Sequence, residues 1–337
     1  MISIMITTYN CSKYIDDCIQ SVINQKKPCE WEILIGDDGS TDGTIDIIKK
    51  WELLYKDNIR VFLNTFSRIG NEKSGFRAAK NRRRLLEEAR GEYLAFLDGD
   101  DRLIGTDKFI DQYNILKTNN SISGVTHNIM INNLIDKKKY PLLNKECTKG
   151  VVDRKKYWKE MYFHTNTLLF RNKCLPLMLK PELAIHLNDN LITYIVLQYG
   201  ELYYINKIYA MYNITGDGVW TGEKQIFGCF RNLTLFDIEV RLNSDFYYSS
   251  VVRHLHDFYF LSKSYNTDLE DEVHNELLKK INREEFSTTY MFANKNNLTI
   301  REKSRYFFFI AYIYILRCFI GGVSRLKKLY NNKKEVN

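Results

Sequence analysis

The chain has 337 residues, of which 45% are hydrophobic and 27% charged, with only 4 Pro and 17 Gly. This composition excludes a fibrous protein and a mainly disordered chain, and it is enough for one large domain with an appendage. The formal net charge is +8, but residues 300–337 hold nine Lys or Arg and two Glu, so the first 299 residues carry only +1. Basic charge gathered at one end of the sequence argues against a nucleic-acid enzyme, which spreads it along a groove.

Cysteine usage and the N-terminal sequence indicate the compartment. The seven cysteines form no Cys-x-x-Cys pair and no Cys/His cluster at zinc spacing, which is typical of reduced thiols. Residues 2–8 run directly into a polar turn, without the features of a signal peptide. We therefore expect a cytoplasmic protein.

Short apolar runs alternate with helical patterns in the first third of the chain, which is typical of strands joined by crossover helices. The expected strands are 2–8, 32–36, 59–63 and 93–97, and the expected helices lie around 18–23, 45–51 and 78–89. Ser12 and the pair Thr41-Asp42 are expected as N-caps of the first two helices. The pattern predicts an α/β fold with a mostly parallel central sheet flanked by helices.

The predicted secondary structure changes at two points in the rest of the chain. Residues 116–222 mix shorter strands with one helix, and the pattern after Gly222 is helical. The expected strands here are 124–131, 167–170 and 202–212, and the expected helix is 188–198. We expect residues 1–115 and 116–222 to form two halves of one domain, followed by a helical extension over 223–337.

Two acidic clusters, Asp37-Asp38 and Asp98-Gly99-Asp100-Asp101, directly follow predicted strands. Ligands bind beyond the carboxyl ends of the strands in such sheets, and converging carboxylates need a cation to offset their repulsion. Oxygen ligands without a neighbouring His or Cys favour Mg²⁺ or Mn²⁺. Either cluster alone also fits a solvated turn.

Four segments resemble the family 2 glycosyltransferases of the GT-A fold, and the resemblance spans roughly residues 1–222. The segments are Ile-Met-Ile-Thr-Thr-Tyr-Asn at 4–10, Ile-Gly-Asp-Asp-Gly-Ser-Thr-Asp at 35–42, Ala-Lys-Asn at 79–81 and Tyr-Leu-Ala-Phe-Leu-Asp-Gly-Asp-Asp at 93–101. The resemblance implies a GT-A-like single domain. Residues 1–115 would bind a nucleotide-sugar donor and residues 116–222 the acceptor.

The resemblance also implies roles for residues of the donor half. Thr7, Tyr9 and Asp38 would hold the nucleotide base and ribose, since a ring packs on a base and a carboxylate accepts from a base N–H or a hydroxyl. Lys80 and Asn81 would contact the donor, with a purely structural role as the open alternative. The arginines at 82–84 are expected to be solvated.

The Asp-x-Asp segment and one acid of the second half complete the implied site. Asp100 would be the direct metal ligand, and Asp98 would contact the ribose or the metal shell, with Mn²⁺ or Mg²⁺ as the ion. The acidic pair of the family maps to Asn188-Asp189, so Asp189 is the expected general base. A helix-start carboxylate stabilised by the helix dipole is the alternative role of Asp189.

The implied function is an inverting hexosyltransferase that moves one sugar from a nucleotide diphosphate sugar, UDP-linked, to a hydroxyl of a cell-surface glycan or lipid-linked glycan precursor. The Gln-x-x-Arg-Trp segment of processive synthases does not occur, which favours a single transfer. Thr215 stands where relatives have a loop His, and whether Thr215 or Asp217 replaces it stays open. A non-catalytic nucleotide-sugar or glycan-binding module and a sugar nucleotidyltransferase are the alternatives.

The basic end of the sequence predicts contact with a membrane. Residues 306–316 are apolar and rich in aromatics, but as a helix they would span about 16 Å of a hydrocarbon core of about 30 Å. The flanking Lys and Arg residues suit anionic headgroups. We expect peripheral binding to the inner face of the cell membrane, with a helix packed on the body as the alternative.

Overall fold

The computed structural model of the chain describes residues 1–64, 74–143, 150–153, 156–157, 163–184 and 186–216. All of them belong to the first of two compact units, Met1–Phe246. The predicted helical extension 223–337, with its basic tail, lies outside the described residues, and so does Asp217.

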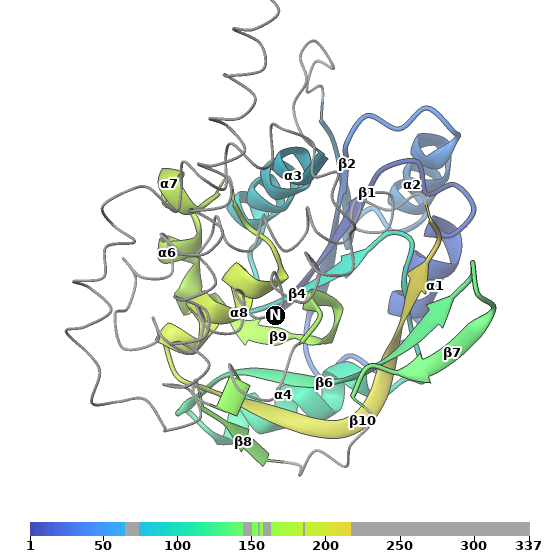
Figure 1. Ribbon diagram of the computed structural model, residues 1–337. Helices are drawn as coiled ribbons and strands as arrows, with labels where there is room; N and C mark the ends of the chain where they lie inside the picture. Colours follow the sequence, from blue (N-terminus) through green and yellow to red (C-terminus); the bar gives the residue numbers. More distant parts are fainter. Residues whose placement is uncertain (65–73, 144–149, 154–155, 158–162, 185, 217–337) are drawn as a thin grey trace, which may run out of the picture. The chain divides into compact units, whose positions relative to one another are not determined.

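The described strands form one ten-stranded sheet in the order β3-β2-β1-β4-β9-β6-β10-β5, with β7 beside β6 and β8 beside β10 (Figure 1). Strands β3, β2, β1 and β4 are parallel. Strand β9 runs antiparallel to both β4 and β6, and β10 runs parallel to β6. The strands are β1 Ile2–Thr8, β2 Trp31–Asp37, β3 Ile59–Leu63, β4 Tyr93–Asp98, β5 Arg102–Leu103, β6 Ile122–Asn133, β7 Lys138–Pro141, β8 Gly150–Val152, β9 Leu169–Arg171 and β10 Glu201–Ile214.

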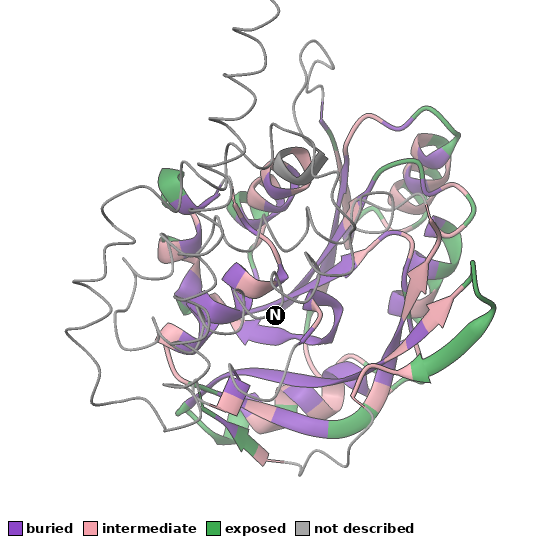
Figure 2. Cartoon of the chain, in the orientation of Figure 1, coloured by how far each residue is buried: buried purple, intermediate pink, exposed green. Residues whose placement is uncertain are grey.

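Helices cover both faces of this sheet. One face packs against α1 Ile15–Ile23, α2 Thr44–Leu54 and α4 Lys108–Thr118, and the other against α3 Ser74–Glu88, α6 Leu175–Met178, α7 Pro181–Ala184 and α8 Asp189–Gln198. Two short 3-10 turns, η1 Thr165–Thr167 and η2 Asn172–Cys174, flank β9. Figure 2 shows the buried residues concentrated on the strands between these layers.

The alternation of side chains along the central strands explains the two cores. In β1, Ile4 and Ile6 point to the core under α1 and α2, whereas Met5 points to the core under α3. Strands covered on both faces read as continuous apolar runs, which is how β1 and β4 appear in the sequence. Packing in these two cores therefore fixes which residues of neighbouring strands lie opposite each other. It also fixes the positions of the polar residues that follow these strands.

The fold agrees with the sequence prediction in its first half and refines it in the second. The four N-terminal strands occupy the predicted places, and β1 and β3 match residue for residue. The second half is mixed rather than parallel. Helix α4 was not predicted, and the third helix begins at Ser74 instead of 78. Within the described residues, no helix has both the length and the apolar character needed to cross a bilayer.

The predicted helix caps were wrong in position. The residues preceding α1 and α2 are Tyr14 and Gly43, and neither gives a side-chain cap. Asp42 instead accepts hydrogen bonds from the backbone N–H groups of Ser12 (3.0 Å) and Thr44 (3.1 Å). Its carboxylate therefore joins the turns that precede the two helices.

Candidate active site

Two acidic loops lie on either side of the carboxyl end of β1. Strand β1 pairs with β2 and β4, so Thr8 lies opposite Asp37 and Thr7 opposite Asp98. We call residues 37–40 the first acidic loop and residues 98–101 the second. Their position at the ends of adjacent parallel strands is where such folds bind ligands.

In the first acidic loop, one carboxylate shapes the turn and the other faces the site. Asp37 is fully buried and accepts from the backbone N–H groups of Gly39 (3.0 Å) and Ser40 (2.8 Å) and from the Ser40 hydroxyl (2.5 Å). Gly39 takes a φ of 81°, which the turn requires and which glycine adopts without strain. Asp38 is thereby turned toward Arg77, whose Nε lies 3.7 Å from its Oδ2.

Tyr9, Asp38 and Arg77 form a small group at this end of the sheet. The Arg77 guanidinium lies 5.5 Å from the centre of the Tyr9 ring, and Tyr9 is 38% exposed. An exposed ring beside a carboxylate and a cation is suited to hold a nucleobase and its ribose. The sequence reasoning missed Arg77. The available signal was its spacing of four residues before Asn81, which places both on one face of α3.

The second acidic loop is fixed by residues far away in the chain. Asp98 accepts from the Thr7 hydroxyl at 2.9 Å. Asp101 is buried and accepts hydrogen bonds from the Asn166 side chain and from the backbone N–H of Asn213 (2.8 Å). The Asn213 side chain also donates to the Asp100 carbonyl at 2.6 Å. The loop is therefore tied to η1 on one side and to β10 on the other.

Crowding of carboxylates changes their acidity. Burial, together with the charge of Asp98, raises the pKa of Asp100 to about 7. Burial, followed by the charges of Asp100 and Asp98, raises the pKa of Asp101 well above its usual range. A bound cation would relieve this repulsion.

Asp98, Asp101 and His164 offer three ligand atoms that lie within 4.8 Å of one another. Two carboxylates and one imidazole that converge in this way fit a divalent metal ion. The group shares Asp98 with the predicted ligand pair but contains Asp101 and His164 in place of Asp100. No His stands near these carboxylates in the sequence, but the turn η1 brings His164 to the loop from a distant part of the chain.

Helix α8 begins at the predicted base. Asn188 is the N-cap, and its side chain accepts from the backbone N–H of Leu191 at 2.9 Å. Asn188 therefore has a structural role at the start of α8. Asp189 follows and is buried.

Asp189 is surrounded by a guanidinium, an imidazole and a hydroxyl group. Its Oδ1 lies 3.6 Å from Arg82 Nη2 and accepts from the Thr165 hydroxyl at 3.2 Å, and its Oδ2 lies 3.6 Å from His164 Nε2. Burial alone would raise the pKa of Asp189, but His164, Arg82 and Thr165 outweigh it and lower the pKa below its usual value. Asp189 is therefore ionised at neutral pH.

Two of the three arginines of α3 differ from the prediction: Arg84 is partly buried and donates to Asn64 Oδ1 at 3.0 Å, and Arg82 is buried. Arg82 is only 7% exposed, and its Nη2 lies 3.3 Å from Asp98 Oδ1 as well as near Asp189. It was expected to be solvated, but α3 turns this side chain toward the sheet. Arg83 does lie at the surface and pairs with Glu87 at 2.8 Å.

The remaining residues that the sequence singled out are Lys80, Asn81 and Thr215. Lys80 is partly buried on α3. Asn81 is 1% exposed, donates to the Gly36 carbonyl at 2.8 Å and accepts from Asn64 at 2.9 Å, so it fastens α3 to β2. Thr215 follows the end of β10 and is partly buried.

Comparisons with known proteins agree with this arrangement. The model of the family described as Glycosyl transferase family 2 matches residues 3–175. The poly(ribitol-phosphate) beta-glucosyltransferase of Bacillus spizizenii is 37% identical over 121 residues, which are 36% of this chain and 18% of that protein. Across eight curated relatives, the matched part covers at most 41% of the relative's length.

Two solved structures share the fold. S. aureus TarS 1-349 in complex with UDP-GlcNAc is 18% identical with a TM-score of 0.50, and the match covers 90% of this chain and 78% of that one. The mannosyltransferase PcManGT from Pyrobaculum calidifontis, in complex with GDP-Man and Mn²⁺, is 14% identical with a TM-score of 0.52. That match covers 86% of this chain and 82% of the other.

Proposed function

Because this chain belongs to glycosyl transferase family 2, we propose that it moves one sugar from a nucleotide diphosphate sugar to a hydroxyl group of a glycan. The observation that supports this most is the convergence of Asp98, Asp101 and His164 between the Tyr9 end of the sheet and Asp189. This order of groups matches the order of a donor: base, diphosphate and reacting sugar.

We propose a UDP-linked donor. A uracil ring offers a face for Tyr9 and an N–H for Asp38, and Arg77 closes the group from α3. The UDP-GlcNAc complex of TarS supports this choice, whereas the GDP-Man complex of PcManGT shows that the same fold accepts another base.

Asp98, Asp101 and His164 would hold a divalent metal ion, with Asp100 beside them. A bound Mn²⁺ or Mg²⁺ would supply positive charge that stabilises the departing diphosphate. The imidazole favours Mn²⁺, because Mg²⁺ prefers oxygen ligands.

Asp189 is proposed as the general base of an inverting displacement. The acceptor oxygen forms a bond to the anomeric carbon on the face opposite the leaving group. The bond from that carbon to the diphosphate oxygen breaks, and the acceptor proton passes to the Asp189 carboxylate. Arg82 and Thr165 hold that carboxylate in place.

We propose that the acceptor is a cell-surface or lipid-linked glycan at the inner face of the membrane. The name of the B. spizizenii relative, a poly(ribitol-phosphate) beta-glucosyltransferase, supports a polymer as acceptor. The +7 charge of residues 300–337 supports membrane contact. Sedimentation of the full chain with phosphatidylglycerol vesicles, and its loss at high salt, tests the membrane contact. Equal sedimentation with neutral vesicles would contradict it.

The donor and metal assignments are tested together by calorimetry. UDP is titrated into the protein with Mn²⁺ and again with EDTA, and we expect binding to be at least tenfold weaker in EDTA. Release of UDP from a panel of UDP-sugars then tests turnover. Equal UDP affinity with and without the metal would remove the metal assignment, and release of pyrophosphate instead of UDP would indicate a nucleotidyltransferase.

A further inference from the structure

The turn between β6 and β7 presents apolar side chains to solvent. Leu134 is 41% exposed, Ile135 is 61% exposed and Tyr140 is 42% exposed. We call residues 134–140, all of which are exposed, the hairpin tip. Isolated exposed apolar side chains are common on soluble domains, but several at one turn mark a surface that contacts a partner or a membrane.

Hydrogen bonds hold the hairpin tip in a defined turn. The Asn133 side chain accepts from the backbone N–H groups of Ile135 (3.0 Å) and Asp136 (2.9 Å), and it donates to the Asp136 carboxylate at 2.9 Å. The backbone N–H of Leu134 donates to the Ile214 carbonyl at 3.1 Å, at the end of β10. The exposed apolar side chains therefore stand on a turn that is fixed to the sheet.

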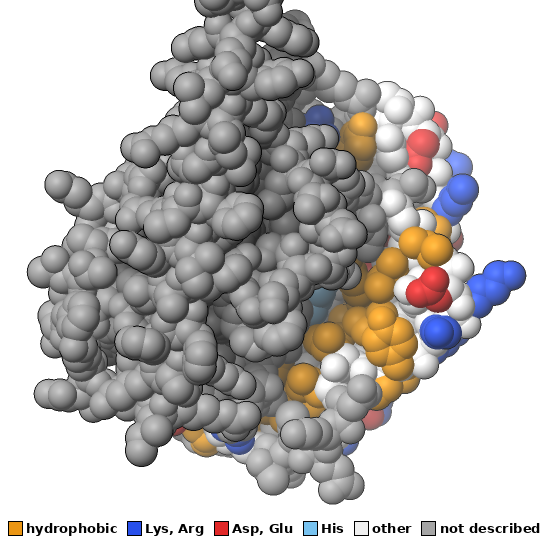
Figure 3. Space-filling model, in the orientation of Figure 1, with side chains coloured by type: hydrophobic (Ala, Val, Ile, Leu, Met, Phe, Trp, Pro, Cys, Tyr) orange, Lys and Arg blue, Asp and Glu red, His pale blue; other side chains and the backbone are white. Residues whose placement is uncertain are grey.

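The hairpin tip is also basic. It contains three consecutive lysines at 137–139 and one acid, Asp136, which gives a formal charge of +2. Within the described part of the chain, none of these lysines makes an ion pair. In the space-filling view, basic side chains project beside apolar ones around the β6–β7 hairpin (Figure 3). Apolar residues flanked by lysines and a tyrosine match the interface of a bilayer with anionic headgroups.

Protection of an edge strand explains only part of this pattern. Among the described residues, β7 pairs with β6 alone, and lysines on such an edge discourage pairing with another chain. That role accounts for the lysines, but it does not account for Leu134 and Ile135, whose exposure costs free energy in water. The apolar residues at the turn therefore indicate contact with lipid.

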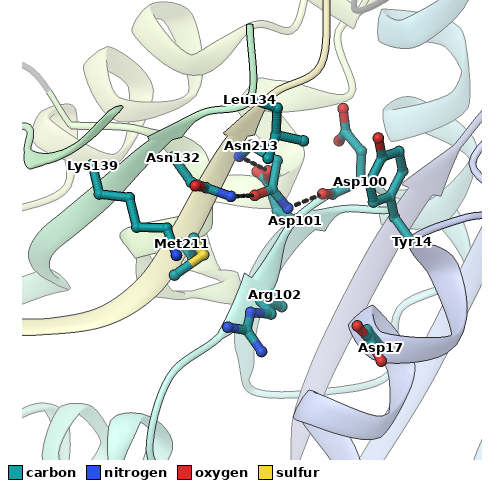
Figure 4. Close-up of a pocket in the computed structure, with 10 residues that line it drawn as sticks. All are labelled: Tyr14, Asp17, Asp100, Asp101, Arg102, Asn132, Leu134, Lys139, Met211 and Asn213. Atoms are coloured by element: carbon teal, nitrogen blue, oxygen red, sulfur yellow. Dashed lines mark hydrogen bonds between the residues drawn. The ribbon is translucent and has the colours of Figure 1, made fainter. Parts of the chain in front are cut away.

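The hairpin tip lies on the side of the domain that carries the second acidic loop. Leu134 and Lys139 border a pocket that also contains Asp100 and Asp101 (Figure 4). The Asn213 side chain, on the strand beside β6, donates to the Asp100 carbonyl at 2.6 Å and so links the two regions. A surface that contacts the hairpin tip would therefore lie next to the second acidic loop.

We propose that the hairpin tip docks on a membrane surface that contains anionic lipids, with Leu134 and Ile135 at the boundary of the acyl chains and the lysines at 137–139 on the headgroup phosphates. This inference rests on the proposed transfer at the inner face of the membrane. It adds to that proposal the side of the domain that meets the lipid, which the charge of residues 300–337 alone does not define.

Sedimentation of the full chain with phosphatidylcholine vesicles, made with and without phosphatidylglycerol, tests the docking surface. Two variants alter the hairpin tip: Leu134→Ser/Ile135→Ser and Lys137→Gln/Lys138→Gln/Lys139→Gln. The control is Leu53→Ser/Leu54→Ser. These two leucines of α2 are 67% and 71% exposed, and Lys49 near them is paired with Glu52 at 2.7 Å.

We expect the serine variant of the hairpin tip to bind anionic vesicles about tenfold more weakly than the unaltered protein. The glutamine variant should also lose about tenfold or more, and its remaining binding should depend less on salt. The α2 control should bind like the unaltered protein, although its leucines are the more exposed pair. Equal losses in the control, or unaffected hairpin variants, would overturn the proposal.

Hydrogen exchange gives a local measurement on the unaltered chain, which does not depend on the folding of any variant. Anionic vesicles should slow exchange of the backbone amides of residues 134–140 and leave those at the end of α2 unchanged. Unchanged exchange at the hairpin tip while the protein is bound to vesicles would show that another part of the chain makes the contact.

UDP titration in the presence of Mn²⁺ separates this inference from the function on which it rests. The hairpin variants should bind UDP like the unaltered protein, because no donor contact is assigned to the hairpin tip. If UDP binds and the unaltered chain sediments with anionic vesicles but the hairpin variants do so equally, the docking surface is wrong and the transferase proposal stands. If UDP does not bind and no UDP-sugar is turned over, the transferase proposal itself fails.

Discussion

The two acidic loops beside β1 carry the same kind of side chain but are held in opposite ways. In the first loop, Asp37 is fixed by Ser40, three residues ahead. In the second loop, Asp101 is fixed by Asn166 and Asn213, which lie 65 and 112 residues ahead. The first loop therefore keeps its shape by local contacts, whereas the second depends on η1 and β10 being folded around it.

The largest effect is expected at Asp189, which lies beside the second loop. Asp189→Asn keeps the size of the side chain but removes its basicity, so the transfer rate should fall by roughly 10²- to 10⁴-fold. UDP affinity should stay within twofold, since no donor contact is assigned to Asp189. Parallel rate and calorimetric measurements check both, with Glu182→Gln on the exposed part of α7 as a control. A variant with near-normal turnover would leave Asp189 as a helix-start carboxylate.

Arg77 and Arg82 allow a matched comparison, because one helix directs them to different loops. Arg82→Gln leaves Asp98 and Asp189 without their buried cation and should lower the free energy of unfolding by about 3 kcal/mol. The Arg77 side chain is 26% exposed and lies 3.7 Å from Asp38, so Arg77→Gln should cost less than about 1 kcal/mol. Urea unfolding of both variants measures the difference. Equal losses would contradict the distinction between the loops.

The Ser40 hydroxyl holds the first acidic loop and the Asn166 amide holds the second. Removing them should change the free energy of unfolding by different but smaller amounts. Asn166→Ala removes a donor to buried Asp101 and should cost about 1–3 kcal/mol, with weaker metal-dependent UDP binding. Ser40→Ala should cost about 1 kcal/mol, because Asp37 keeps two backbone donors. Thermal unfolding with and without UDP and Mn²⁺ distinguishes them. A larger loss in Ser40→Ala would reverse our view of which loop depends on distant contacts.

The last prediction concerns a buried amine beneath the second loop, whose contribution is spread over several pH units. Lys108 is 1% exposed and donates to the Asn166 carbonyl at 2.5 Å, and burial lowers its pKa from 10.5 to about 7. Between these two values the unfolded chain binds more protons than the folded one, so this group makes stability rise with pH from about 7 to about 10. The slope is on the order of 1 kcal/mol per pH unit.

Lys108→Met should remove that contribution. Urea unfolding from pH 6.5 to 9.5 should give a flatter dependence for the variant than for the unaltered protein. His127, whose pKa burial and Lys108 keep well below its usual value, stays neutral over this range and does not contribute. Parallel curves would show that Lys108 is not the titrating group.

Local patterns in the sequence were enough to predict the first acidic loop and its strands. The polar residues follow apolar strands directly, and the parallel neighbours of β1 were recognisable as buried runs. The elements that follow β4 were harder to predict from the sequence. Strand β9 is three residues long and follows the irregular turn η1, so the strand expected at 167–170 begins only at Leu169. Helix α4 buries Lys108 and Gln112 beside Phe109, which hides its apolar stripe.

The groups that complete the site were missed for a related reason. His164 lies just before a 3-10 turn with no periodic pattern, and only the packing of that turn brings it to Asp98. Arg82 belongs to a run of three arginines, and the direction of each depends on how α3 is rotated on the sheet. Long-range placement of this kind leaves no local pattern in the sequence.

The close contact between Gly36 and Asn81 fixes where α3 lies on β2. A Cβ at position 36 would come within 2.0 Å of the Asn81 Oδ1, so even Gly36→Ala would displace the side chain that fastens α3 to β2. Arg77 and Arg82 are five residues apart on that helix, about 7.5 Å along its axis, and would be displaced together. One methyl group on a β-strand would therefore affect both the Asp38 end and the Asp189 end of the candidate site through α3, although it touches neither carboxylate.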